Sequence, residues 1–404
     1  MASHTEAAHH ADGTVWGLDP ISGSARWKVM SGVKGNLPPV VDQGRVLVGG
    51  LGLVALSRGR GQELWSASPV PDVTTPPLPS GPWVFTGEAN ARPNLDSYPK
   101  PARHLIERYA DHYYINFHKP LALMETARGC PFKCNFCSVW KFHHSTFREK
   151  SPRRVVEELQ AISAPNVFIT DDIFWLDVRR GEAMAREIKA AGIKKYFTVQ
   201  TRTDIICKFP HLIEMWKECG SLAIFLGLES VTDEGLARVN KKNTAANNER
   251  AIAILKELGV GFTPNFIVDP AWDHEDFERL REWISRTGAY NSGFSVLTPL
   301  PGTELWAEAK DRVTTHDWEM FDIIHAVLPT NLPLAEFYRE YARLWRHVLE
   351  VRYHLRGKAR TYFQLGAALA TGKVSLGSVR KGMNLAKVFS KPETFLAAHA
   401  GHSA

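Results

Sequence analysis

Cys130-Pro131-Phe132-Lys133-Cys134-Asn135-Phe136-Cys137 places three cysteines within eight residues. Three thiolates can bind three irons of a cubane cluster and leave the fourth iron without a protein ligand. A small molecule can chelate at such an open iron and receive an electron directly. A fully extended run of this length spans roughly 23–25 Å, so the loop must curl to bring its sulfurs to one cluster. Gly129 and Pro131, on either side of the first cysteine, suit that curl.

Three other kinds of site also use closely spaced cysteines. A structural zinc site takes four ligands, often as paired C-x2-C units, and only one such pair occurs here. A plant-type ferredoxin loop has C-x4-C-x2-C spacing and a distant fourth cysteine, so the first gap here is one residue short. Five cysteines are an odd and low number for a disulfide-stabilised chain of 404 residues. The spacing therefore favours a cluster with an open iron.

The motif, preceded by Glu125-Thr126-Ala127-Arg128-Gly129 and with the aromatic Phe136 before its third cysteine, resembles that of the radical S-adenosylmethionine (SAM) superfamily. The resemblance implies a 4Fe-4S cluster held by Cys130, Cys134 and Cys137, whose open iron binds the amino and carboxylate groups of SAM. In that superfamily, electron transfer splits SAM into methionine and a 5′-deoxyadenosyl radical. It also implies an electron donor such as a ferredoxin or a flavodoxin.

The composition is that of an ordinary globular protein, with 44% apolar and 23% charged residues. No run approaches ~18 unbroken apolar residues, so no transmembrane segment is expected. The N-terminus has no basic region followed by an apolar run, so no secretory signal is expected. Few cysteines and an oxygen-sensitive cluster predict a cytoplasmic protein.

The net charge of +6 is unevenly distributed. From Val351 to Ala404 the only acidic residue is Glu393. The basic residues there are Arg352, Arg356, Lys358, Arg360, Lys373, Arg380, Lys381, Lys387 and Lys391. Such a segment suits an anionic surface, either nucleic acid or lipid headgroups, and a solvated helical face is the alternative.

The beginning of the chain repeats itself with a shift of 38 positions. Gly17-Leu18-Asp19, Gly23 and Trp27 recur as Ala55-Leu56-Ser57, Gly61 and Trp65. A period near 40 residues, built of short β runs and glycine turns, is typical of propeller blades, and the pattern resembles pyrroloquinoline-quinone-type propeller repeats. Two blades cannot close a ring of at least ~4. We therefore expect residues 1–88 to be a propeller-like fragment, completed by another chain or left from a fusion, and residues 89–100 to be a linker.

Strands and helices alternate beyond the linker. Strands are predicted at Leu121–Thr126, Val167–Thr170, Tyr196–Gln200, Leu222–Leu226, Phe262–Val268 and Gly293–Leu297. Helices are predicted between them, for example from Ser151-Pro152, at 246–258 and at 275–284. This alternation predicts an α/β fold in which residues 101–330 form a partial, TIM-like (β/α)6 barrel, followed by a helical and basic region at 331–404. Pro264 inside a strand predicts a bend or an edge position.

Polar residues follow the predicted strands, at the mouth where such barrels carry their chemistry. The second strand ends in Asp171 and Asp172, the third in Gln200 and Arg202, and the fourth in Glu229. We expect these residues, with Phe136, to line one cavity and contact SAM. A guanidinium can grip a carboxylate in two parallel bonds, so Arg202 is predicted to bind the SAM carboxylate, and Glu229 or Asp172 its amino or ribose groups. A local cap or a structural ion pair is the alternative for each.

From about Pro93 onward the chain is similar to radical SAM enzymes of the cobalamin-associated class, and most similar to hopanoid C-3 methylases. The stretches that carry this similarity are 101–105, 125–140, 170–172, 243–252, 266–270 and 297–303. The resemblance implies methylation of an unactivated carbon by way of methylcobalamin. The chain departs from that class because the propeller-like fragment stands where a cobalamin domain is expected, and no D-x-H-x-x-G motif occurs. Cobalamin as a cofactor is therefore left open.

Three functions follow as alternatives. The first is a radical SAM methyltransferase acting on a hopanoid-like lipid, with the basic tail on anionic headgroups at the inner face of the membrane and nucleic acid disfavoured as a partner. The second is a radical SAM enzyme of another reaction type, including modification of RNA or peptide. The third is a non-catalytic scaffold with a vestigial cluster.

Overall fold

The computed structural model describes residues 93–352 apart from 116–117, residues 388–400, and short separate segments between residues 6 and 85. The chain divides into two units, Met1–Pro93 and Asn94–Ala404. The boundary falls inside the predicted linker. Leu95 is buried, and the Asp96 carboxylate accepts a hydrogen bond from the Ser151 backbone, so both residues pack within the second unit. The linker assignment stays a prediction.

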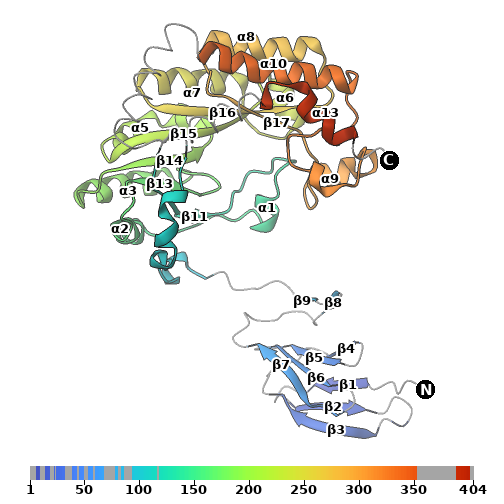
Figure 1. Cartoon of the computed structure of the whole chain (residues 1–404). Helices are drawn as coiled ribbons and strands as arrows, with labels where there is room; N and C mark the ends of the chain where they lie inside the picture. The colour runs from blue at the N-terminus through green and yellow to red at the C-terminus, as the bar shows by residue number, and fades with distance from the viewer. Residues whose placement is uncertain are drawn as a thin grey trace. The chain divides into compact units, whose positions relative to one another are not determined.

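The first unit consists of antiparallel sheets (Figure 1). Its strands are β1 (Glu6–His9), β2 (Thr14–Leu18), β3 (Ala25–Met30), β4 (Val40–Asp42), β5 (Arg45–Gly49), β6 (Leu53–Ser57), β7 (Glu63–Ala67), β8 (Leu78–Ser80) and β9 (Trp83–Phe85). β1 to β3 form one sheet and β4 to β7 another. Val15 on β2 packs with Val46 and Val48 on β5 in one small core. The propeller assignment stays a prediction.

The second unit is built on six parallel strands in the order β10-β13-β14-β15-β16-β17. Their bounds are β10 (Leu121–Met124), β13 (Asn166–Ile169), β14 (Lys195–Thr201), β15 (Gly220–Glu229), β16 (Gly261–Val268) and β17 (Gly293–Val296). All six predicted strands are confirmed, and their curled sheet is a partial TIM-like barrel. The short strands β11 (Ala127–Arg128) and β12 (Arg148–Glu149) pair beside it.

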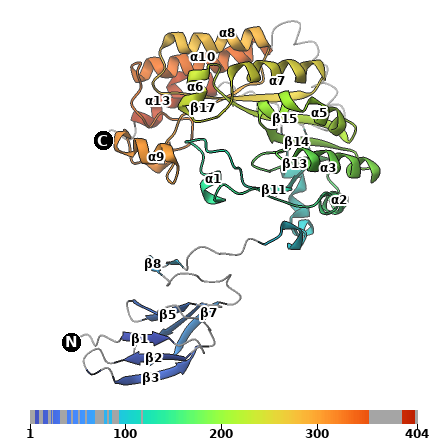
Figure 2. The same cartoon turned by 180° about the vertical axis from the view of Figure 1, so that it is seen from behind.

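Helices cover the outer side of this sheet, whereas α1 lies on its other side (Figures 1 and 2). The helices are η1 (Leu95–Ser97), η2 (Arg103–His112), α1 (Val139–Phe142), α2 (Pro152–Gln160), α3 (Val178–Ala190), α4 (Thr203–Lys208), α5 (Pro210–Lys217), α6 (Asp233–Arg238), α7 (Ala245–Glu257), α8 (His274–Thr287), α9 (Glu304–Ala309), η3 (Lys310–Arg312), η4 (Trp318–Met320), α10 (Leu334–Arg352) and α13 (Pro392–Ala400). Ser151 caps α2 as predicted, because its hydroxyl accepts from the Arg154 backbone.

Pro264 does not lie at an edge, so that part of the prediction is wrong. β16 lies between β15 and β17, and Pro264 is aligned with Leu226 of β15. The irregularity in this pair of strands falls instead between Gly227 and Glu229 of β15, where the register shifts. This shift matters for function because Glu229 adopts a left-handed backbone, with φ of 64°.

The C-terminal helices α10 and α13 are confirmed within the described residues. Phe337, Tyr341 and Val348 of α10 are buried on one face, as predicted. Phe395 of α13 stacks on Tyr338 of α10, with ring centroids 5.3 Å apart. Residues 353–387, which carry most of the basic residues of the tail, lie outside the described part of the chain, so a membrane role for them stays a prediction. Among the described residues, no helix has both the length and the apolar character needed to cross a bilayer.

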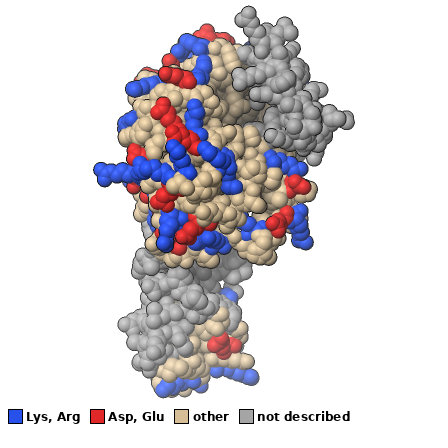
Figure 3. Space-filling view, turned by 90° about the vertical axis from the view of Figure 1, so that its left-hand side faces the viewer, with Lys and Arg blue, Asp and Glu red and all other residues tan. Residues whose placement is uncertain are grey.

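The face that carries α2, α3 and α5 mixes both signs of charge (Figure 3). Arg153 lies near Glu157, Arg186 near Glu182, and Lys189 near Glu218. Basic and acidic side chains are therefore interspersed over the described part of this face.

Candidate functional site

The cysteine loop begins at a sharp turn after β11. Gly129 has φ of 94°, and a Cβ there would collide with the carbonyl oxygen of Thr146. Only glycine fits such a backbone without strain. The predicted curl around the first cysteine is therefore present, and Gly129 is required for it.

The middle of the loop is held by segments that follow β15 and β17. The Asn135 backbone N–H donates to the Val239 carbonyl at 3.2 Å, and its side-chain amide donates to the Arg238 carbonyl at 3.0 Å. The Asn135 carbonyl accepts from the Leu305 backbone at 2.9 Å. Because these partners of Asn135 come from two distant parts of the chain, the barrel itself positions the loop.

The three thiols are largely buried and near one another. Burial raises the pKa of Cys130 to about 11, and the charges of Cys137 and Cys134 add to that rise. Burial likewise raises the pKa values of Cys134 and Cys137. Iron binding to such thiols has to displace their protons. The positive charges of Lys241 and Arg202 lower the pKa of Cys134 and so reduce the free-energy cost of forming a thiolate there.

A cluster fits these thiols better than a single metal ion. Within the described part of the chain, no three Cys, His, Asp or Glu side chains converge on a point where one ion would bind. A cubane places each thiolate on a different iron, so its ligands do not have to meet at one point. The donor set of three cysteines without a fourth protein ligand also fits the cluster.

Two adjacent aspartates at the end of β13 hold the segment that leads into the loop. The buried Asp171 carboxylate accepts from the Thr126 backbone at 2.5 Å and from the Thr126 hydroxyl. Asp172 accepts from the Gly129 backbone at 2.8 Å, directly before Cys130. The charge of Asp172 also raises the pKa of Cys137, so Asp172 lies near both the start and the end of the cysteine loop. The pair therefore positions the loop, and the predicted contacts of both residues with SAM stay predictions.

We expect the Asp171→Asn variant to gain stability relative to the wild type as pH rises. Burial raises the pKa of Asp171 from 3.8 to about 6, against the opposing bonds from Thr126. Between about pH 4 and pH 6 the folded chain therefore keeps a proton that the unfolded chain releases, and the wild type loses stability as pH rises through this range. Asparagine keeps the shape without the charge. The difference in the free energy of unfolding between the variant and the wild type should grow by about 3 kcal/mol from pH 4 to pH 7. Urea unfolding of both proteins at the two pH values measures it. A difference that does not change with pH would contradict the role of Asp171.

Arg202, at the end of β14, lies under the cysteine loop. Its guanidinium carbon is 3.8 Å from the centroid of the Phe132 ring. It donates two bonds to Asp204 and one each to the carbonyls of Lys241 and Lys242. A guanidinium has five N–H groups, so these four bonds leave one for a ligand. The predicted grip on the SAM carboxylate stays a prediction, and two parallel bonds would require Arg202 to release a present partner.

Gln200, also on β14, turns toward the aspartate pair. Its side-chain amide donates to the Asp171 carbonyl at 3.4 Å. This weak bond ties the end of β14 to the end of β13. Contact between Gln200 and SAM stays a prediction.

Glu229, at the end of β15, pairs with Lys241 at 2.7 Å. Both side chains are largely buried, and the charges of both act on Cys134. Lys241 was not predicted from the sequence as a site residue. It follows α6 in a loop with left-handed residues on both sides, Asn240 and Lys242, and only the folded chain brings it to the cysteines.

Phe136 packs at the carboxyl ends of β16 and β17. It contacts the small apolar cluster of Val239, Leu297 and Leu305, together with Ile267. Three members of this set, Val239, Ile267 and Leu297, also line a pocket of about 520 Å³ that reaches Glu229. Phe136 itself is not among the residues that line this pocket, so its predicted contact with SAM stays a prediction.

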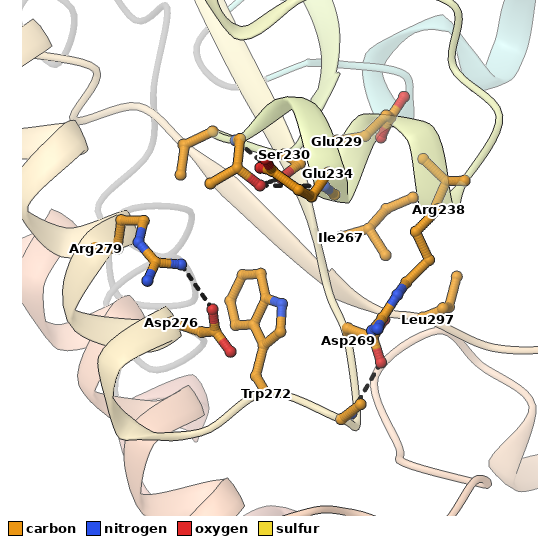
Figure 4. A pocket seen from close by; sticks show the side chains of 15 residues that line it. Glu229, Ser230, Glu234, Arg238, Ile267, Asp269, Trp272, Asp276, Arg279 and Leu297 are labelled. Atoms are coloured by element: carbon orange, nitrogen blue, oxygen red, sulfur yellow. Dashed lines mark hydrogen bonds and ion pairs between the residues drawn. The ribbon is translucent and has the colours of Figure 1, made fainter.

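The pocket beside Glu229 opens between α6 and α8 (Figure 4). Arg238 meets Asp269 on one side, and Arg279 meets Asp276 on the other. Trp272 lies between these two ion pairs. The lining thus combines these ion pairs with the apolar side chains of Val239, Ile267 and Leu297.

A second and larger cavity runs along the outer edge of β10, the first strand of the sheet. It has a volume of about 1010 Å³, and η2 forms its other wall. Its lining includes Pro120 at the start of β10, and Glu125 and Arg128 at the point where the cysteine loop begins. We call it the edge groove; its other apolar and aromatic lining residues include Tyr98, Ile106, Tyr113, Leu121, Leu123 and Met124. It therefore links an apolar surface to the mouth of the barrel.

The two cysteines outside the motif are core residues. Cys207 and Cys219 are buried, and their thiols donate to the carbonyls of Asn247 and Ala185, both at 3.3 Å. Both thiols therefore have hydrogen-bond partners within the fold.

Comparison with known proteins identifies the region around the loop. A family model described as the Radical SAM superfamily matches residues 124–284, which contain the three cysteines and β13 to β16. The hopanoid C-3 methylase of Methylococcus capsulatus is 35% identical over 306 residues, 76% of this chain and 58% of that protein. The anaerobic magnesium-protoporphyrin IX monomethyl ester cyclase of Rubrivivax gelatinosus is 27% identical over 230 residues, 55% of this chain and 41% of that protein. The chain thus spans about half the length of these curated relatives.

Several solved structures also align with this chain. The cobalamin-dependent S-adenosylmethionine radical enzyme OxsB, with aqua-cobalamin and S-adenosylmethionine bound, aligns with a TM-score of 0.45 at 16% identity. The alignment covers 61% of this chain and 45% of that chain.

Proposed function

Residues 124–284 form a radical SAM domain, and from this premise we propose that the chain cleaves SAM reductively. The domain implies a 4Fe-4S cluster and SAM, and Cys130, Cys134 and Cys137 are the residues that would hold the cluster. When bound, the cluster supplies the electron that breaks a carbon–sulfur bond of SAM. The observation that carries this proposal is the meeting of the cysteine loop with the charged ends of β13, β14 and β15.

The first experiment is the detection of 5′-deoxyadenosine. Anaerobically reconstituted protein, reduced with dithionite and supplied with SAM, is expected to form 5′-deoxyadenosine and methionine. The same mixture without reductant is the control. Protein that contains the cluster and yet forms no deoxyadenosine would exclude this function and favour a scaffold.

We further propose that SAM lies with its adenosine toward Phe136. The 520 Å³ pocket has an apolar wall of Val239, Ile267 and Leu297, which suits a nucleobase, and Phe136 packs against the same apolar cluster. Glu229 lines the same pocket and would accept a hydrogen bond from a ribose hydroxyl. A carboxylate is a strong acceptor for such hydroxyls. Lys241 would keep the Glu229 charge compensated until the ligand arrives.

The reaction that we propose is methylation of an unactivated carbon in a hopanoid-like lipid. Two observations support it: the similarity to a hopanoid C-3 methylase, and the edge groove that leads to the cysteine loop. Apolar pockets of roughly 300–1,000 Å³ hold ligands of the size of a polycyclic lipid. The similarity to a ring-forming cyclase supports a second candidate, a radical reaction without methyl transfer. Product that contains a methyl group only when methylcobalamin is added would support the first candidate, and an unmethylated product the second.

The edge groove gives a matched test of the substrate. Ile106 lines the groove, and its neighbour Leu105 on the same helix is not among the lining residues; both are exposed, by 48% and 69%. We expect Ile106→Arg to weaken binding of a hopanoid in detergent micelles by about tenfold, the equivalent of about 1.4 kcal/mol, because a guanidinium would meet the apolar rings. Leu105→Arg should change it less than about twofold. Equal effects of the two variants would remove the groove from the account.

A further inference from the structure

The indole of Trp140 connects the molecular surface with the cysteine loop. Its N–H donates to the carbonyl oxygen of Cys134 at 3.1 Å, so the ring is held against the backbone of the residue that carries the buried thiol. Trp140 is partly exposed and belongs to the short helix α1, which lies apart from the helices that cover the sheet (Figures 1 and 2).

Two lysines flank this indole. The Lys133 ammonium is 5.7 Å and the Lys141 ammonium 5.4 Å from the centroid of the Trp140 ring. Among the described residues, neither ammonium has a carboxylate within 4.0 Å, although most other surface lysines and arginines of α2, α3 and α8 have one. Two cations without compensation near one aromatic ring create a local positive potential.

An exposed apolar side chain completes the surface. Phe142 at the end of α1 is 79% exposed, which makes it the most exposed large apolar side chain among the described residues. Lys133, Trp140, Lys141 and Phe142 together form what we call the loop face. An aromatic centre with a charged rim is the usual composition of a protein–protein contact.

We propose that the loop face docks a small acidic electron-carrier protein. This inference rests on the proposed function, because only a reductive reaction needs a carrier. The carrier would be oxidised by one electron, and that electron would break the carbon–sulfur bond of SAM. Weak electron-transfer contacts are small, below about 1,200 Å², and depend on charge complementarity. A small face with two lysines suits a contact of this kind with an acidic partner. The hydrogen bond from Trp140 to Cys134 connects this face directly to the cysteine loop.

The test measures the binding of oxidised flavodoxin to the reconstituted protein by calorimetry, at low and at high salt. Lys133 and Lys141 are both replaced by glutamate in one variant, and Phe142→Ser is a second variant that leaves the charge unchanged. The matched control replaces Lys310 and Arg312 with glutamate, because both are exposed, lie on η3, and have no ion pair among the described residues. The control changes the net charge by the same amount. Iron content and circular dichroism verify that each variant is folded and loaded.

The double replacement at the loop face is expected to weaken flavodoxin binding at least tenfold at low salt, and Phe142→Ser about threefold or more. The control should change it less than about threefold. Equal weakening by the control, or no binding of flavodoxin to the wild type at low salt, would overturn the inference. Deoxyadenosine formation by the wild type with dithionite is measured in parallel. Its failure would count against the proposed function, whereas its success with unchanged carrier binding in the variants would count against the loop face alone.

Discussion

The Cys134→Ser variant is expected to lose its iron–sulfur cluster and all SAM cleavage while it stays folded. Cys134 is the most buried of the three motif cysteines, with 7% of its surface exposed. Clusters of this kind are held by thiolates, and a hydroxyl is a much poorer iron ligand. Iron per reconstituted chain should fall from about four to well below one, and the cluster absorbance should disappear. The measurement is iron and sulfide analysis with a visible spectrum, together with the deoxyadenosine assay.

Cys207→Ser is the matched control for this experiment. Cys207 is also 7% exposed, and its thiol donates to a backbone carbonyl that a serine hydroxyl can reach. The control should keep its iron and its activity. A Cys134→Ser protein with full iron content, or a Cys207→Ser protein without iron, would mean that the motif cysteines are not the ligands.

The Glu158→Ala variant is expected to lose about 3 kcal/mol or more of stability. Glu158 is 1% exposed and binds Lys150 and Arg103, both at 2.8 Å. Removing one member of a buried ionic group leaves the others without compensation, which typically costs about 3–5 kcal/mol. Burial raises the pKa of Glu158, but the bonds from Lys150 and Arg103 outweigh burial and hold it below its usual value. The stabilisation is therefore present at neutral pH and is lost as pH falls below about 4.5.

The neighbouring residue supplies the control. Glu157 is 39% exposed on the same helix and lies 3.5 Å from Arg153 and 3.6 Å from Arg154. Glu157→Ala should change the free energy of unfolding by less than about 0.5 kcal/mol. Urea unfolding of both variants at neutral pH measures the two effects. Similar values for the two would show that the buried group does not stabilise η2 against the barrel.

The parallel sheet was predictable from the sequence because its strands appear as short apolar runs between helical patterns. The cysteine loop was predictable because its three cysteines lie in one short segment. The order of the polar strand ends also followed, since the carboxyl ends of parallel strands meet at one edge of the sheet.

The contacts within the site were not predictable in the same way. Asp171 and Asp172 have the same side chain and adjacent positions, yet one is buried against Thr126 and the other accepts from Gly129. Lys241 reaches the site through tertiary packing, and no local spacing marks it. Trp140 follows the loop directly, but its hydrogen bond back to Cys134 forms only when the loop is folded. The burial of Leu95 and the hydrogen bond between Asp96 and the Ser151 backbone, within the predicted linker, also depend on the folded chain.

Electron–nuclear double resonance of the reduced, reconstituted chain, with SAM labelled by nitrogen-15 at its amino group, tests the open iron most directly. The account predicts a hyperfine coupling between the cluster and the labelled nitrogen, and its loss in the Cys134→Ser protein. A cluster that shows no coupling to bound SAM, or a metal analysis that finds only zinc, would contradict it.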